Sequence, residues 1–331
     1  MRKLASIKRI EEIKSIPDAD KICAYRVGGW WIVDQINRYK VGDLAVYFEI
    51  DSFLPLKPEF EFLRSRCYKQ NGNGEYGMQL RTIRLKRVVS QGLLLSLTFE
   101  AKEGDDVTEL LGVTLYEKAI PAQLAGVVKG NFPSFLIKSD ENRLQNFDDE
   151  ELNNIKGQLS YVGEKCNGSS LTSYIRNNEF GVCSRNLELK ESEGNAYWQA
   201  VRLLNLEEKL RKLNRNICLQ GELIGPGIQG NMYNLSDKQV YFFTGYDIDT
   251  SSRLSFTELK TLLNELELKM VPIISDTFVV PDTNIIDYML EIADGKSLLN
   301  PRVDREGVVV RGINKQFSFK VISNSFLLKE K

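Results

Sequence analysis

Two lysines and two glutamates stand where β-rich runs of this sequence begin or end, and together they could do phosphate chemistry. Lys165 precedes a short turn at Gly168, and the backbone N–H groups of such a turn can approach phosphate oxygens. Glu222 ends another β-rich run, Glu306 opens a further one, and Lys320 closes the last. Two carboxylates suit a hard divalent cation, and two lysines suit an anion. We therefore expect Glu222 and Glu306 to hold a metal beside an anionic substrate.

The composition restricts which chemistry is available. The chain of 331 residues has no histidine, which removes Ser-His-Asp triads, His-ligated metals and imidazole acid–base chemistry. Its net charge of −1 argues against a protein that binds nucleic acid through its overall charge, but it permits a local basic groove. The five cysteines lack CxxC spacing, and no apolar run approaches the roughly 18 residues of a membrane helix. A cytoplasmic protein, in a reduced compartment, is the simplest interpretation.

The first third of the chain reads as short strands separated by turns. The β-rich stretches are residues 22–27, 30–36, 44–50, 82–89 and 93–99. Five or so strands in about 100 residues are typical of a small β-barrel, and an OB-fold is the leading candidate. We expect residues 1–117 to be an OB-fold nucleic-acid-binding module and residues 118–331 to be a second domain.

This module contains a basic stretch, residues 81–87. Read as one strand, its alternation places Arg84 and Lys86 on one face and the remaining arginines on the other. It is either a solvated strand or a stripe that follows a nucleic-acid backbone. Of the neighbours Trp30 and Trp31, one is expected in the core and the other could offer a stacking ring.

The rest of the chain alternates strands and helices. Strands are expected at residues 217–223, 240–248 and 307–311, and helices at residues 148–156 and 197–213. Ser255 and Glu258 form a capping-box pattern that opens another helix.

Six motifs in a fixed order resemble the covalent nucleotidyltransferase superfamily of ATP-dependent ligases and capping enzymes. They are Glu164-Lys165-Cys166-Asn167-Gly168, Cys183-Ser184-Arg185-Asn186, residues 220–229, residues 242–248, Glu306-Gly307-Val308-Val309 and Ser318-Phe319-Lys320. Upstream, residues 132–135 and 139–146 are similar to the lead-in of the RNA ligase 5 branch. The resemblance implies an α+β fold: an N-terminal OB-fold β-barrel, then a nucleotidyltransferase (lysyl-AMP) domain of antiparallel sheets with flanking helices.

The activity that the resemblance implies is that of an ATP-dependent RNA ligase, in RNA repair. Lys165 would attack the α-phosphate of ATP and release pyrophosphate. AMP would pass from the lysine to a 5′-phosphate end of RNA or DNA, and an RNA 3′-OH end would then displace it, within a nicked duplex. Mg²⁺ or Mn²⁺ would assist. A monomer without a membrane partner is expected.

Nucleotide-binding roles follow from the same resemblance. Glu164 would bind the adenine amino group, and Tyr246 would stack on the base. Arg143 would contact the nucleotide, and Asn167 and Gly168 would form the turn beside it.

The resemblance also implies five catalytic residues. Lys165 would be the nucleophile and Lys320 would contact the α-phosphate. Arg185 would hold ribose and the 5′-phosphate of the strand, Glu222 would bind ribose or metal, and Glu306 would bind metal.

Two positions depart from the superfamily's pattern. Asn167 stands where Asp is most frequent, and Ser318 stands where many relatives have Lys. Asn167 leaves open an RNA-binding protein that keeps the scaffold but is weak or inactive as a catalyst. A DNA ligase or capping-like enzyme is a further alternative. Ser170 in place of the capping enzymes' Arg, and only eleven residues after Lys320, favour the RNA ligase.

Overall fold

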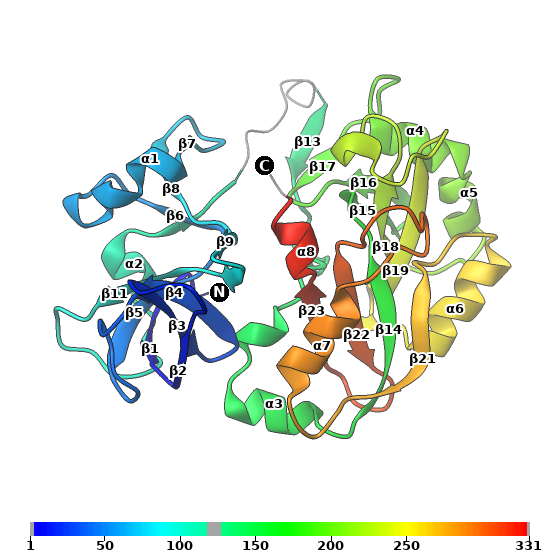
Figure 1. The fold of residues 1–331 in the computed structure, drawn as a ribbon. Helices are drawn as coiled ribbons and strands as arrows, with labels where there is room; N and C mark the ends of the chain where they lie inside the picture. The colour runs from blue at the N-terminus through cyan, green and yellow to red at the C-terminus, as the bar shows by residue number, and fades with distance from the viewer. Residues whose placement is uncertain (1–2, 118–126, 330–331) are drawn as a thin grey trace. The chain divides into compact units, whose positions relative to one another are not determined.

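A computed structural model describes residues 3–117 and 127–329, which form two compact units (Figure 1). Within the described residues, the first unit comprises residues 3–117, 144–151 and 327–329, and the second comprises residues 127–143 and 152–326. The expected boundary between residues 117 and 118 adjoins residues 118–126, which lie outside the described ranges. The membership of residues 144–151 in the first unit differs from the single division that we expected.

The first unit consists of antiparallel strands and short helices. Its sheets are β1 (Ala5–Arg9), β5 (Leu44–Phe48) and β11 (Leu93–Ser96); β2 (Glu12–Ser15), β3 (Ile22–Val27) and β4 (Trp30–Gln35); β12 (Thr114–Leu115), β6 (Ser52–Leu54), β8 (Tyr76–Gln79) and β7 (Tyr68–Gln70); and β9 (Ile83–Leu85) with β10 (Val88–Ser90). Its helices are η1 (Pro58–Leu63), α1 (Arg64–Cys67), α2 (Thr108–Leu111) and η3 (Leu144–Asn146). The described strands of this unit form these separate open sheets and not one closed barrel.

The basic stretch is a hairpin and not the single strand that we expected for residues 82–89. Leu85 pairs with Val88, and Lys86 and Arg87 form the turn between them with φ values of 46° and 72°. The predicted alternation of faces therefore fails at the turn. The prediction that one tryptophan lies in the core is confirmed: Trp30 is buried and its indole N–H donates to Asn146 Oδ1 at 2.9 Å, whereas Trp31 is partly exposed.

The second unit contains two antiparallel sheets. The first runs in the order β13 (Val128–Asn131), β17 (Leu187–Leu189), β16 (Glu179–Cys183), β15 (Ser169–Arg176), β18 (Ile217–Ile224), β19 (Gln239–Asp247) and β20 (Ser252–Arg253). The second runs in the order β21 (Ile273–Val279), β14 (Leu159–Lys165), β22 (Gly307–Gly312) and β23 (Ser318–Ile322). Antiparallel sheets with flanking helices are the predicted α+β class.

Helices cover these sheets with their apolar faces. They are α4 (Ala196–Leu203), α5 (Leu206–Arg211), α6 (Phe256–Glu265) and α7 (Ile285–Ala293), with α3 (Asp149–Ile155), η4 (Gln229–Asn231) and α8 (Asn324–Leu327) elsewhere. Figure 1 shows α4, α5 and α6 beside the larger sheet, where Trp198, Leu206 and Leu259 pack in one core with strand residues. The predicted helix at 197–213 breaks at Asn205, whose φ is 51°. The capping box at Ser255 is present and is worth about 1 kcal/mol.

Candidate active site

The turn that follows Lys165 carries the chain from one sheet of the second unit to the other. Lys165 ends β14 in the smaller sheet, and Ser169 begins β15 in the larger one. A Cβ atom at Gly168 would lie well inside van der Waals contact of Leu223 O, so only glycine fits there. Because Ser170 pairs with Glu222 on β18, this close approach brings the glutamate beside the turn.

Lys165 is ion-paired with Glu306. Lys165 pairs in register with Gly307, so Glu306 lies just before the partner strand β22. The Lys165 Nζ atom lies 2.6 Å from Glu306 Oε1, and the two side chains are 26% and 14% exposed. A charge-assisted hydrogen bond of this length, partly removed from water, holds the lysine at a fixed position.

The carboxylates around Lys165 control its protonation. Burial by itself lowers the pKa of Lys165, but the charges of Glu306 and Glu222 outweigh burial and hold that pKa above its usual value. Burial also raises the pKa of Glu222 to about 8, although the positive charge of Lys165 opposes this. Beside these carboxylates the lysine is therefore an ammonium ion, and the pKa of about 8 keeps Glu222 largely protonated at neutral pH.

Lys320 and Arg143 meet along the edge of the smaller sheet. Lys320 lies on β23 opposite Val309, its N–H donates to Asn142 O at 2.8 Å, and it forms a parallel bridge with Arg143. Since Val309 in turn pairs with Gly163, two residues before Lys165, Lys320 and Lys165 share one face of this sheet.

Glu141, whose side chain is 8% exposed, anchors the segment that carries Arg143. Its Oε1 accepts from Arg311 Nη2 at 2.9 Å, and its Oε2 accepts from the Ser318 hydroxyl. The serine that replaces a lysine of many relatives thus has a hydrogen-bonding role in this chain.

Glu164 is directed to the opposite face of β14 from Lys165. It is 2% exposed, and its Oε2 accepts from the Leu298 N–H at 2.7 Å. Its Oε1 is buried and has no hydrogen-bond partner among the described residues. A buried carboxylate oxygen of this kind requires a donor, and the amino group of a base is a suitable one.

The middle of the turn packs against Met232 and Tyr233. The backbone N–H of Asn167 donates to Tyr233 Oη at 2.6 Å, and its side-chain amide nitrogen lies 3.2 Å from Met232 Sδ. Cys166 is buried in an apolar cluster with Ile224 and Tyr233. Burial raises the pKa of the Cys166 thiol well above its usual value, which is unfavourable for a nucleophile.

Arg185 lies in the exposed turn after β16. Its side chain is 60% exposed and donates to Asp140 Oδ1 at 2.9 Å. Its charge still acts on the pKa of Glu222, although less strongly than burial, Lys165 or Glu306 does. An exposed pair of this kind contributes little to stability, so the guanidinium can exchange Asp140 for a phosphate at small cost.

The structure does not bring Tyr246 to this group of residues. Tyr246 pairs with Cys218 and is 4% exposed, enclosed in a cluster with Tyr174 and Cys183. A ring so enclosed cannot stack on a base, and this assignment is corrected.

Phe243 is an aromatic residue of the same apolar cluster, together with Tyr233 and Tyr241. Gln220 pairs with Thr244 and Gly221 pairs with Phe242, so Phe243 is the extra residue of a β-bulge in β19. The bulge directs its partly buried ring into the cluster that contains Cys166. Motif spacing does not reveal a bulge, and the run of aromatic residues at 241–243 was the available signal.

Comparisons with known proteins agree with this arrangement. A family model described as an RNA ligase matches residues 160–322, and one described as an OB-fold domain matches residues 4–97. The RNA ligase of Naegleria gruberi with pyrophosphate is 40% identical, with a TM-score of 0.91 over 100% of this chain and 99% of that chain. This chain belongs to the RNA ligase family.

Two further structures of the Naegleria gruberi RNA ligase show the same similarity. A lysine-to-alanine variant with ATP and manganese is 39% identical, and a lysine-to-methionine variant with AMP and manganese is 40% identical. Each has a TM-score of 0.91 over 99% of both chains.

No curated protein matches the chain. The predicted enzyme class, an ATP-dependent RNA ligase, is confirmed, and so is an N-terminal OB-fold domain. The alternatives, an inactive RNA-binding protein, a DNA ligase and a capping-like enzyme, are not favoured.

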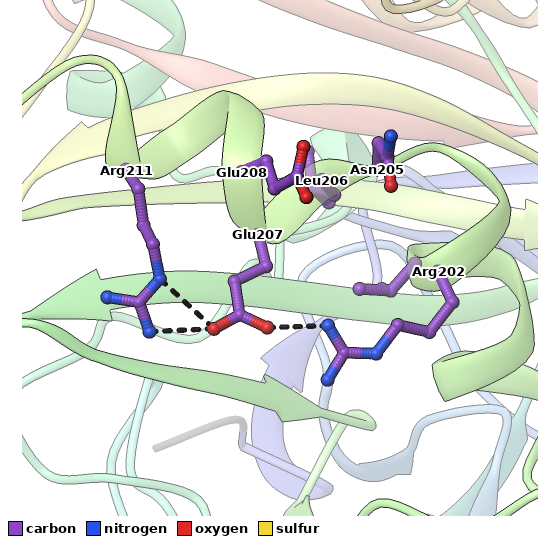
Figure 2. Close-up of a pocket in the computed structure, with 7 residues that line it drawn as sticks. Arg202, Asn205, Leu206, Glu207, Glu208 and Arg211 are labelled. Carbon is purple, nitrogen blue, oxygen red and sulfur yellow. Dashed lines mark hydrogen bonds and ion pairs between the residues drawn. The ribbon is translucent and has the colours of Figure 1, made fainter.

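A separate pocket of this RNA ligase lies on α4 and α5, and none of the predicted site residues lines it (Figure 2). Glu207 lies between Arg202 and Arg211 and is hydrogen-bonded to both. The charges that line this pocket are thus compensated within the protein.

None of the helices in the described ranges is long and apolar enough to cross a membrane.

Proposed function

We propose that this RNA ligase joins an RNA 3′-OH end to a 5′-phosphate end. Lys165 carries AMP from ATP to the 5′-phosphate. The observation that carries the proposal is the position of Lys165 Nζ, 2.6 Å from Glu306 and beside the turn that Gly168 closes. ATP as the AMP donor is supported by the relatives' structures with ATP, AMP and pyrophosphate.

The proposed reaction has three steps. First, neutral Lys165 Nζ forms a bond to the α-phosphorus of ATP, pyrophosphate leaves, and the amine loses a proton. Second, a 5′-phosphate oxygen of the strand attacks the same phosphorus, and Lys165 leaves and regains a proton. Third, the oxygen of the RNA 3′-OH bonds to the 5′-phosphorus and loses its proton, the bond from that phosphorus to AMP breaks, and AMP leaves. Lys320 contacts the α-phosphate in the first step, and Arg185 binds the strand's 5′-phosphate in the second.

Lys165 must lose a proton before the first step. Making half of a free lysine neutral at pH 7 costs about 4.6 kcal/mol, and its two carboxylate neighbours increase this cost. Glu306 and Glu222 are suited to hold Mg²⁺ or Mn²⁺, which offsets their charge and the charge on the transferring phosphoryl group. When the carboxylates are so engaged, burial lowers the pKa of Lys165 in the direction that the reaction needs.

The nucleotide base lies, in this proposal, on the other face of β14. Glu164 Oε1 accepts from the adenine amino group, because this buried oxygen has no hydrogen-bond partner among the described residues. Phe243 stacks on the base in place of Tyr246, since its ring lies beside the Lys165 turn. Arg143, adjacent to Lys320, contacts the phosphates, and Asn167 and Gly168 line the turn.

The two domains have separate roles in this proposal. We propose that residues 1–117 are the nucleic-acid-binding module and residues 118–331 the nucleotidyltransferase domain, acting as a monomer on a nicked duplex. The 5′-phosphate strand is RNA or DNA. RNA repair in the cytoplasm is the proposed role, consistent with five free cysteines in the described structure.

Transfer of label from [α-³²P]ATP to the protein tests the nucleophile. Lys165→Ala should abolish the labelled adduct. Lys165→Arg keeps a cation beside Glu306 but cannot become neutral, and it should also form no adduct. Lys190→Ala, at an exposed lysine, should label like the wild type. An acid-labile adduct on Lys165→Ala would show that another residue carries AMP.

A further inference from the structure

Residues 64–87 of the first unit carry a large excess of positive charge. The segment contains one carboxylate, Glu75, and seven cations: Arg64, Arg66, Lys69, Arg81, Arg84, Lys86 and Arg87. The whole chain has a net charge of −1, so this excess is local. All seven are exposed except Arg81, which is partly exposed. Among the described residues, only Arg64 has an ion-pair partner, Glu61.

Two exposed tyrosines lie within this segment. Tyr68 on β7 and Tyr76 on β8 stack with ring centroids 5.4 Å apart and an interplanar angle of 13°. They are 39% and 51% exposed. The Arg64 guanidinium lies 4.8 Å from the Tyr68 ring. Figure 1 shows α1 beside β7 and β8, and the contact of Arg64 with Tyr68 joins this helix to the tyrosine pair.

The cations continue from this surface toward β9. Burial raises the pKa of the Cys67 thiol, and the charges of Arg81 and Arg66 oppose that rise, which places both arginines near the residue that precedes Tyr68. An open hollow of about 420 Å³ is lined by residues 81–84 and Leu328. Beyond it, Lys86 and Arg87 occupy a two-residue turn at positive φ, where Asn and Gly are preferred. The hairpin thus presents two cations at its tip despite the backbone strain.

We propose that Tyr76 and Tyr68, with Arg64, Arg66 and Lys69, form a platform that binds an unpaired nucleotide of an RNA strand that extends beyond the nicked duplex. An exposed aromatic face with cations around it is how proteins bind single-stranded nucleic acid, the base stacking on the ring and the phosphates meeting the cations. Within a duplex both faces of a base are covered by neighbouring bases, so the platform selects a single-stranded segment. The inference rests on the proposed function, in that the protein acts on RNA ends.

The charge and the rings together favour RNA over an acidic protein segment. An acidic peptide would be attracted by the seven cations alone, and the loss of one ring would weaken it little. A nucleotide needs the ring as well, because base–aromatic stacking changes affinity by about fivefold to 150-fold. The contribution of Tyr76 therefore distinguishes the two partners.

The test measures the affinity of the full-length protein for a labelled 12-nucleotide single-stranded RNA and for a blunt nicked duplex, at several salt concentrations. Tyr76→Ala and Tyr76→Leu should each weaken single-strand binding by at least about fivefold. Tyr76→Phe, which keeps the ring, should stay within about twofold of the wild type. The nicked-duplex affinity and the salt slope should not change. Arg66→Ala should instead reduce the single-strand log–log salt slope by about 0.7.

The matched control is Tyr288→Ala in the second unit. Tyr288 is 46% exposed and stacks with Phe278 at 6.3 Å and 22°, but its neighbours along α7 include Asp287 and Glu291. It should bind single-stranded RNA like the wild type. Unchanged affinity for Tyr76→Ala and Tyr76→Leu, or an equal loss for Tyr288→Ala, would overturn the platform. Competition by polyglutamate with no effect of the tyrosine variants would identify a protein-docking surface instead. ATP labelling of the same variants separates the two ideas, because failure of the platform leaves labelling intact.

Discussion

The Lys165 centre and the basic segment 64–87 use charge in opposite ways. At the centre, Lys165, Glu306 and Glu222 are largely removed from water, and the pKa of each of Lys165 and Glu222 is set by the others and by burial. In the basic segment the cations are exposed and, with the exception of Arg64, have no described ion-pair partner. Transfer of a phosphoryl group requires control over the proton of the nucleophile. Binding a nucleic-acid strand requires a positive electrostatic field that reaches the solvent.

The two regions should therefore respond differently to single substitutions. Breaking a buried ion pair leaves an uncompensated charge and typically costs 3–5 kcal/mol. An exposed cation contributes about one phosphate contact, and many such contacts add up to the affinity. We expect large, specific losses at the Lys165 centre and small, additive ones in the basic segment.

The largest effect beyond loss of the nucleophile is expected for Gly168→Ala. The new methyl group would collide with Leu223 O, and the turn would have to move away from β18. A displacement of about 1 Å at reacting groups can cost a factor of about 100, so ATP labelling should fall at least that far. Gly194→Ala is the control, because its Cβ meets no atom within 4 Å. Normal labelling by Gly168→Ala would mean that the turn tolerates the shift and does not position Lys165.

The pH dependence of self-adenylation should be the next largest effect. Glu306 and Glu222 hold the pKa of Lys165 above its usual value, so raising the pH increases the neutral, reactive fraction by up to about tenfold per pH unit. Glu222, whose pKa is about 8, ionises over the same range and becomes a better cation ligand. The labelling rate should thus rise from pH 6 to pH 9. Sealing of a pre-adenylylated nick, which does not use Lys165 as nucleophile, should rise less. Equal slopes in the two assays would argue against this role of the lysine proton.

Arg185→Ala should give the smallest of these effects and sharpens the comparison, because Arg185 is exposed yet acts near the buried centre. Its salt bridge to Asp140 is 60% and 54% exposed, so its loss should leave the fold and self-adenylation within about twofold of the wild type. Sealing of a nick should fall by about tenfold, since a charge-assisted contact to the 5′-phosphate is lost. Arg202→Ala, another exposed and ion-paired arginine, should leave both rates unchanged. Equal losses in labelling and sealing would indicate a role in ATP binding.

The sequence predicted those parts of the site that depend on local spacing. Lys165 and Glu164 are adjacent on a strand and so face opposite sides, and Gly168 stands where two strands meet closely. These features follow from alternation and from the size of glycine, and both can be read from a few neighbouring residues.

Other parts depended on events that local patterns do not encode. A β-bulge moves Phe243 into the site's apolar cluster and leaves Tyr246 in another. The hairpin at Lys86 and Arg87 lacks the Asn-Gly signal of its turn type, so the stretch reads as one strand. The strand β21 pairs with β14 across more than 100 residues of sequence, a distance that no local pattern reports.

The return of residues 144–151 to the first unit makes that unit discontinuous along the chain. Trp30 donates its indole N–H to Asn146, and a Cβ atom at Gly29 would lie 2.6 Å from the Gln145 Cα, so the segment is part of the module's interior. A fragment that ends at residue 117 would lose the hydrogen bond from Trp30 to Asn146 and leave this packing open. For the same reason, recombination could not exchange the module between ligases through one crossover. A functional exchange would have to transfer the distant segment as well, so the module and its partner domain are expected to be inherited together.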